Sequence, residues 1–398
     1  GIEDPVCSGD LWYPRGPGAA TTRRPTSSKH EMHMSRSLRS RPGVIPLAAL
    51  VLLAGCQRAP VAQESGPVFP AGWAYRADRT PVTAANGMVV STDDLASRVG
   101  VDVLRGGGNA VDAAVAVQFA LAVVNPEAGN IGGGGFMVLR MADGSTAALD
   151  FREKAPGAAS RDMFLDDEGN VTERSVVGHL AAGVPGTVRG MWEAHQRFGS
   201  KPWEELITPA VELAEGFPVR PLFLNSLDTE MVRALSSFAT SAAQFLPRDG
   251  QPPNVGDTLR QLDLAETLRR IREEGPDGFY RGETADLIVA EMERGGGIMT
   301  LQDLRAYTAA WRDPIVFAYR GHSVVSMPPS SSGGATMAEI ANILEGYDLG
   351  SMPWHGPEMI HLYAEAWKRA YADRNQYLAD PDFVDMPLDR MTSTEYAA

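Results

Sequence analysis

The chain has 398 residues, enough for two or three domains, and its 44% hydrophobic and 22% charged residues are ordinary for a globular protein with a sizeable core. A net charge of −14 argues against a nucleic-acid partner. Cys7 and Cys56 are too few for a disulfide framework, and neither has His or Cys neighbours at metal-ligand spacing. We therefore expect no structural disulfide, no metal and no cofactor.

The first part of the chain has the composition of a leader. Residues 1–33 begin without Met and are rich in Pro, Gly, Ser and Arg, which predicts a disordered upstream extension. From Met34, three arginines precede the apolar run Val44–Gly55, which is shorter than the roughly 20 residues that span a bilayer. This pattern predicts a signal peptide over residues 34–55.

The end of that apolar run contains a candidate lipidation site. Its last three residues and the cysteine that follows them, Leu53-Ala54-Gly55-Cys56, resemble the bacterial lipobox, in which the cysteine is diacylated and becomes the mature N-terminus. The alternative is an ordinary cleaved signal peptide with a chance cysteine. On the lipobox interpretation, residues 56–80 are a tether, and the protein is periplasmic and meets the membrane only through its lipid anchor.

The folded part is expected over residues 81–398. Val89 and Val90 predict a short buried strand, and Thr92 predicts a helix N-cap with two acidic residues in the first turn. Asn109 predicts the cap of a helix over Val111–Val124, which is apolar on nearly all sides and so is expected within a layer.

The central stretch, Asn125–Pro156, looks suited to ligand binding. Glycines 132–135 permit close backbone approach, and Asp143-Gly144 predicts a hairpin turn between two apolar segments. A two-residue turn there would place Arg152 opposite Gly135, where its planar guanidinium suits a carboxylate. The alternative is that Arg152 only forms an ion pair with Asp150 or Glu153.

The rest of the chain is mostly helical, with one further hairpin around Arg320-Gly321. The expected order along the chain is helices, a hairpin, helices, a second hairpin and helices, without βαβ alternation. This order predicts an α+β layered or sandwich fold. The expected helices are Leu262–Glu274, Thr284–Arg294, Leu301–Tyr307, Thr336–Glu345 and Pro357–Leu378, and the expected strands of the second hairpin are Ile315–Tyr319 and Ser323–Met327.

Several motifs of catalytic and nucleotide-binding proteins are missing from the sequence. Neither G-x-G-x-x-G, the P-loop pattern nor G-x-S-x-G occurs, so the glycines predict no phosphate site and the serines at 330–332 predict a turn after a strand. His355, Glu358 and His361 fall on different faces of a helix, unlike the i, i+4 histidines of a metal site. These patterns yield one candidate binding arginine and no candidate nucleophile.

Seven short strings, in order from Gly106 to Arg374, together resemble the gamma-glutamyltranspeptidase family: GGGNAVDAAVA, NPEAGNIGGGGFM, DFREKAP, GVPGTVRG, GPDGFYRG, SMPPSSSGG and AYADR. The resemblance implies an N-terminal-nucleophile hydrolase with an αββα sandwich, made as a self-cleaving precursor. Residues 81–398 would be the large-subunit portion, truncated before the small subunit that carries the threonine nucleophile. Arg152, in the FRE string, is then implied to bind the substrate α-carboxylate.

The function implied by the resemblance is hydrolysis and transfer of the γ-glutamyl group of glutathione and related amides. Alternatives are a glutaryl or cephalosporin-type acylase of the same family and a non-catalytic binding lipoprotein. The chain alone is expected to be inactive, because the nucleophile is missing. It is also expected to aggregate or fold poorly, because much of the helix Val111–Val124 and both hairpins would lack cover without the small subunit. The glycines 132–135 are expected to be packing backbone near Arg152.

Overall fold

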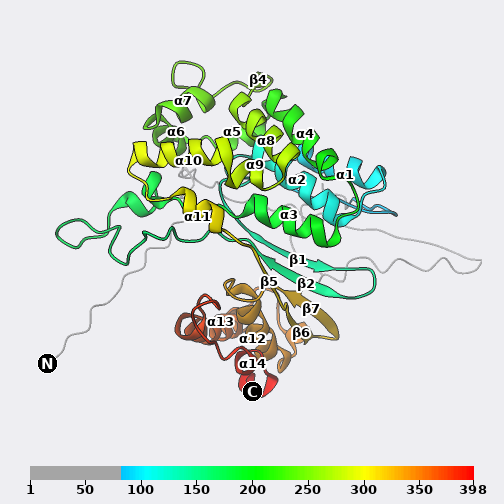
Figure 1. Cartoon of the computed structure of the whole chain (residues 1–398). Coiled ribbons are helices and arrows are strands. Elements are labelled where there is room, and N and C mark those ends of the chain that lie inside the picture. Colours follow the sequence, from blue (N-terminus) through cyan, green and yellow to red (C-terminus); the bar gives the residue numbers. More distant parts are fainter. Residues whose placement is uncertain (1–81) are drawn as a thin grey trace, which may run out of the picture. The chain divides into compact units, whose positions relative to one another are not determined.

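The computed structural model describes residues 82–398 (Figure 1). The predicted leader, signal peptide, tether and Cys56 lie outside these residues. The described part mixes helices with short antiparallel strands, which confirms the α+β class. Its strands form the sheet β1-β2-β5 and the pairs β3-β4 and β6-β7. Their bounds are β1 Phe136–Arg140, β2 Thr146–Asp150, β3 Phe217–Pro218, β4 Thr258–Leu259, β5 Ala310–Arg312, β6 Ile315–Tyr319 and β7 His322–Ser326.

Figure 1 shows the hairpin β1-β2 between the helices α1–α11 and the helices α12–α14, and the hairpin β6-β7 beside α12. The α-helices are α1 Asp94–Arg105, α2 Ala110–Val124, α3 Thr187–Phe198, α4 Trp203–Glu215, α5 Pro221–Asn225, α6 Thr229–Ser236, α7 Ala239–Phe245, α8 Leu262–Glu274, α9 Asp277–Tyr280, α10 Gly282–Gly295, α11 Leu301–Ala306, α12 Gly333–Glu345, α13 Pro357–Tyr377, α14 Leu388–Met391 and α15 Thr394–Ala397. Short 3-10 helices are η1 Glu173–Ser175, η2 His179–Ala181 and η3 Leu349–Ser351. Within residues 82–398 no helix has the length and apolar character needed to cross a bilayer.

Helix α2 lies in the core, as its sequence predicts. Asn109 caps it, and the Asp112 carboxylate accepts the Asn109 backbone N–H at 2.8 Å, which completes a capping box. Helices α1, α3 and α4 pack against α2, and most of its residues are buried. The expectation that this helix lacks cover is therefore wrong, because elements of the same chain surround it.

Two expectations at the start of the folded part are also wrong. Asp93, not Thr92, is the N-cap of α1, since its Oδ1 accepts the Leu95 N–H at 2.8 Å. The segment containing Val89 and Val90 forms no strand: Val89 packs close to Gly100 on α1, whereas Val90 is 82% exposed. The segment lies along a helix and finds no neighbouring strand with which to pair.

The first hairpin has a longer turn than the sequence predicts. The Met141 N–H donates to the Ser145 carbonyl at 2.9 Å, and Gly144 takes a left-handed φ of 87°. The Asp143 carboxylate accepts both the backbone N–H and the hydroxyl of Ser145, which stabilises this three-residue loop. The register therefore shifts by one residue: Gly135 exchanges backbone hydrogen bonds with Phe151, and Arg152 does not lie opposite Gly135.

The second hairpin turns around Arg320-Gly321, as predicted, and Tyr319 pairs with His322, so the turn has two residues. Arg320 and Gly321 adopt left-handed φ values of 48° and 78°, which suit the twist of an antiparallel hairpin. Its second strand begins one residue earlier than predicted. The Arg320 guanidinium also donates to the carbonyls of Leu344 and Tyr347 at 3.1 and 2.8 Å, so it satisfies carbonyls at the C-terminal end of α12.

Helices α12 and α13 pack together over a buried acidic residue. Glu339, on α12, is 2% exposed, and its Oε2 has no hydrogen-bond partner among the described residues. Burial, together with the nearby negative charge of Asp373, raises the pKa of the Glu339 carboxyl to about 7. The folded state therefore binds a proton that the unfolded chain, with an ordinary pKa of 4.5, releases at lower pH.

This difference predicts a pH-dependent stability. The stability contributed by Glu339 is present below pH 4.5 and is lost as the pH rises through about 7. The melting temperature of Glu339→Gln should equal that of the wild type near pH 4.5 and should be higher than that of the wild type above pH 7. Circular dichroism melts at several pH values measure this, with the exposed Glu358→Gln as control. A Glu339→Gln melting temperature that tracks the wild type at every pH would contradict the assignment.

Candidate functional site

Arg152 lies two residues beyond the end of strand β2, and its backbone is held on both sides. Its N–H donates to Asp150 Oδ1 at 3.1 Å, and its carbonyl accepts the Tyr307 hydroxyl at 2.8 Å. Tyr307 comes from the segment after α11, far along the chain. The backbone from which the guanidinium projects is therefore fixed by tertiary contacts.

The Arg152 side chain itself remains accessible. It is 58% exposed, its Nε lies 3.1 Å from Glu153 Oε2, and its guanidinium carbon lies 5.5 Å from the Phe136 ring centre. One of the ion pairs considered from the sequence therefore forms, the pair with Glu153. An exposed pair of this kind contributes only about 0–1 kcal/mol, so it leaves the Arg152 guanidinium able to exchange Glu153 for another anionic group at little cost.

Asp150 is committed to other partners. Its buried carboxylate accepts Arg312 Nε at 2.9 Å and the Ser330 hydroxyl at 3.2 Å, besides the Arg152 N–H. Arg312 also lies 3.1 Å from Asp382. Neither Arg312, Ser330 nor Asp382 was predicted as part of a site. No local pattern could identify them, because 162 and 180 residues separate Asp150 from Arg312 and Ser330.

Tyr307 acts as a stable hydrogen-bond donor. Its ring stacks on Tyr280 with 5.8 Å between the ring centres and an interplanar angle of 5°. Burial, with the neighbouring Tyr280, Asp150 and Glu153, raises the pKa of the Tyr307 hydroxyl above its usual range. The hydroxyl therefore stays protonated and continues to donate to the Arg152 carbonyl.

The glycine run is packing backbone, as predicted. The Gly133 carbonyl accepts the N–H groups of Gly186 and Thr187 at 2.7 and 3.1 Å, at the start of α3. A Cβ on Gly134 would lie 2.5 Å from the Phe151 carbonyl oxygen, so these two segments of the backbone lie closer together than a side chain at residue 134 would permit. The loop thus supplies a carbonyl to the helix N-terminus and supports the strand that leads to Arg152.

Two hollows border the Arg152 side chain. The first, here called the Arg152 hollow, has a volume of about 220 Å³ and is lined mainly by polar groups, among them Asp150, Arg152, Lys154, Tyr307 and Arg312. The second has about 470 Å³ and runs from Arg152 to the segment 181–183. The predicted binding residue therefore faces open space on both sides.

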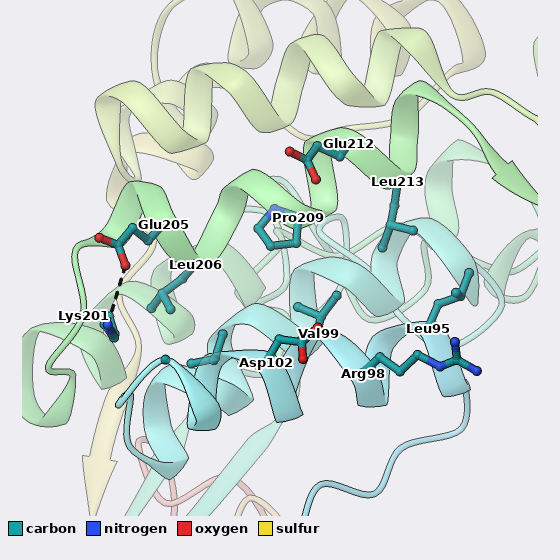
Figure 2. Close-up of a pocket in the computed structure, with 12 residues that line it drawn as sticks. Leu95, Arg98, Val99, Asp102, Lys201, Glu205, Leu206, Pro209, Glu212 and Leu213 are labelled. Carbon is teal, nitrogen blue, oxygen red and sulfur yellow. Dashed lines mark ion pairs between the residues drawn. The ribbon is translucent and has the colours of Figure 1, made fainter.

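A third hollow lies elsewhere. A groove of about 550 Å³ lies between α1 and α4. Figure 2 shows that both apolar and charged side chains line it. Among the charged groups, Lys201 Nζ lies 3.9 Å from Glu205. Arg152 and its partners do not line this groove, so the groove gives no support to the predicted site.

The remaining candidates from the sequence give no second site. Within residues 82–398 no cluster of three or more His, Cys, Asp or Glu side chains is arranged to hold a metal ion, and this includes the tested set of His355, Glu358 and His361. Ser330 lies in the predicted turn, between the end of β7 and the start of α12.

Comparison with known proteins identifies the class. A sequence model described as Gamma-glutamyltranspeptidase matches residues 96–398. The Helicobacter pylori gamma-Glutamyltranspeptidase crystal structure superimposes with a TM-score of 0.78 at 45% identity, covering 80% of this chain and 91% of that one. The fold is therefore that of the N-terminal-nucleophile hydrolases, which confirms the expected αββα sandwich class.

Curated relatives include proteins of two kinds. The Glutathione hydrolase proenzyme of Pseudomonas sp. (strain A14) is 51% identical over 326 residues, 81% of this chain and 56% of that protein. The Acylase ACY 1 proenzyme of Pseudomonas sp. (strain V22) is 40% identical over 331 residues, 81% of this chain and 59% of that protein. The chain belongs to the gamma-glutamyltranspeptidase family, and it spans somewhat more than half the length of these relatives.

The Asp150 network predicts a large stability effect. Asp150→Asn leaves the Arg312 guanidinium, 16% exposed, without its buried carboxylate, and should lower the free energy of unfolding by about 2–4 kcal/mol. Urea unfolding measures this. As a control, Asp102→Asn removes the 70% exposed ion-pair partner of Arg105 and should cost less than about 1 kcal/mol. Equal effects of the two substitutions would show that the buried network contributes no more than a surface pair.

Proposed function

We propose that this chain is the arginine-bearing part of a γ-glutamyl hydrolase and transferase precursor that acts on glutathione and related γ-glutamyl amides. The observation that carries the proposal is Arg152: its exposed guanidinium projects from a fixed backbone into open hollows, in a chain of the gamma-glutamyltranspeptidase family. The fork of guanidinium donors suits bidentate binding of the substrate α-carboxylate.

The proposed chemistry is acyl transfer by the threonine that begins the small subunit. Self-cleavage of the precursor forms this subunit, which stays bound to the present chain as a heterodimer. The threonine hydroxyl adds to the γ-carbonyl carbon, the amide C–N bond breaks, and the amine leaves with the proton. Water then hydrolyses the glutamyl ester, or an acceptor amine takes up the glutamyl group. The role of the described residues is to hold the glutamyl end through Arg152.

The surface of α13 supports the proposed heterodimer. Ile360, Tyr363, Trp367 and Tyr371 recur at helical spacing along one face of α13, and each is more than a third exposed. A continuous apolar stripe on a helix is typical of a protein interface. The small subunit of the proposed precursor is the partner that we assign to this face.

An acylase is the second candidate, favoured by the 40% identity with the ACY 1 proenzyme. Such an enzyme would take a glutaryl amide, which lacks the α-amino group of a γ-glutamyl amide. Rates of the complete precursor on matched γ-glutamyl and glutaryl anilides distinguish the two functions. Preference for the glutaryl compound would replace the first proposal with the second.

Substitution of Arg152 tests the carboxylate-binding role. In the complete precursor, Arg152→Ala should raise KM for a γ-glutamyl anilide, because loss of a bidentate charged contact costs on the order of 2–5 kcal/mol in binding. Arg152→Lys keeps the charge but not the planar fork of donors, so its KM should lie between those of the wild type and Arg152→Ala. An unchanged KM for Arg152→Ala would remove Arg152 from the site.

Two controls accompany that measurement. Equal circular dichroism spectra of wild type and variants exclude misfolding as the cause. Residues 56–398 expressed alone should show no turnover, since the proposed nucleophile belongs to the small subunit, and threonine-dependent turnover by that fragment would contradict the proposed division of labour.

We also propose that Cys56 is diacylated and anchors the protein in the periplasm through the tether 56–80. The support is the sequence: a basic segment, a short apolar run and a cysteine at the lipobox position. Cys56→Ser should abolish incorporation of labelled palmitate and move the protein from the membrane fraction to the soluble periplasmic fraction. Membrane association that persists in Cys56→Ser would show that another feature holds the protein there.

A further inference from the structure

A second cation accompanies Arg152. Lys154 lies two residues further along the chain and lines both hollows that border Arg152. In extended chain, residues i and i+2 project to the same side, with their Cα atoms about 7 Å apart. Two positively charged side chains of different geometry therefore face the same open space.

The backbone of Lys154 is anchored like that of Arg152. Its N–H donates to the Val184 carbonyl at 3.2 Å, and its carbonyl accepts the Val184 N–H at 2.8 Å. Gly183 permits this close pairing, because a Cβ there would lie 2.9 Å from Glu153 Cβ. The two cations thus rise from one fixed segment, and only their side chains need to adjust to a ligand.

The charge pairing within the Arg152 hollow differs among its three cations. Arg312 contacts two carboxylates, Asp150 and Asp382, and Arg152 contacts one. Lys154 Nζ lies 3.4 Å from the Thr308 hydroxyl and 5.5 Å from the Tyr307 ring centre, and in the described part of the chain no carboxylate lies within 4 Å of it. An ammonium offers three donors, so Lys154 retains capacity for an anionic group.

We propose that Lys154 binds the C-terminal carboxylate of the peptide on the leaving side of a γ-glutamyl substrate. This inference rests on the proposed function, in which Arg152 takes the α-carboxylate of the glutamyl group. A γ-glutamyl peptide carries these two carboxylates at opposite ends, whereas a γ-glutamyl anilide carries only the first. The planar fork of Arg152 suits bidentate capture, and the compact ammonium of Lys154 suits a single, more mobile carboxylate. Lys154 is thus a specificity-determining residue that favours peptides with a free C-terminus.

The test compares substrates that differ in the second carboxylate. The complete precursor is assayed with glutathione, with glutathione whose C-terminal carboxylate is an amide, and with a γ-glutamyl anilide. Lys154→Met should raise KM for glutathione roughly three- to tenfold and leave KM for the other two within about twofold. Lys154→Arg keeps the charge and should retain most of the preference for glutathione over its amide. Lys368→Met, at a 70% exposed lysine on α13, is the matched control and should change none of these values.

The outcomes separate the inference from the function on which it rests. An unchanged glutathione KM in Lys154→Met, with normal anilide turnover, overturns the role of Lys154 and leaves the proposed function standing. An equal rise for all three substrates also overturns it, because Lys154 would then act on the glutamyl end or on the fold. Absence of turnover by the wild-type precursor on every γ-glutamyl substrate would instead refute the proposed function.

Discussion

A single buried carboxylate connects the parts of this fold that meet at Arg152. Asp150 ends strand β2 and accepts hydrogen bonds from the Arg152 backbone, from Arg312 and from Ser330. Through Arg312 the network also reaches Asp382. A buried charge is tolerated only when it is paired and hydrogen-bonded, so the segments that supply these donors must all be in place together. The same requirement fixes the position of the segment that carries Arg152.

The site separates rigidity from accessibility. Backbone contacts hold Arg152 and Lys154, through Tyr307 and Val184, while both side chains remain exposed. The glycine run contributes to the rigid part, since the Gly133 carbonyl accepts hydrogen bonds from the start of α3 and the backbone of Gly134 packs on residues 151–153, which follow β2. A ligand that binds here would order only the two side chains, because their backbone is already fixed. A fixed backbone lowers the conformational entropy lost on binding.

Much of the fold follows from local sequence. Helix α8 has the predicted bounds, and Arg320-Gly321 forms the predicted turn, because capping and turn chemistry depend on neighbouring residues. The predicted strand register at Asp143-Gly144 is wrong by one residue. The Asp143 carboxylate binds Ser145 and stabilises a three-residue loop, which the Asp-Gly pair alone does not predict. Arg152 could be singled out from its residue type and the family resemblance. Its supporting partners could not, because the fold brings them together from distant positions, where neither periodicity nor spacing applies.

The tyrosine that holds the Arg152 carbonyl has a consequence for the order of folding. Tyr307 lies 155 residues after Arg152, and forming that contact closes a loop whose entropy must be lost before the contact forms. During synthesis, hairpin β1-β2 emerges and can pair long before Tyr307 leaves the ribosome. Its turn therefore forms locally, but the end of the hairpin that leads to Arg152 is anchored only after Tyr307 has been synthesised. Chains interrupted before this point would contain a folded hairpin with an unanchored arginine.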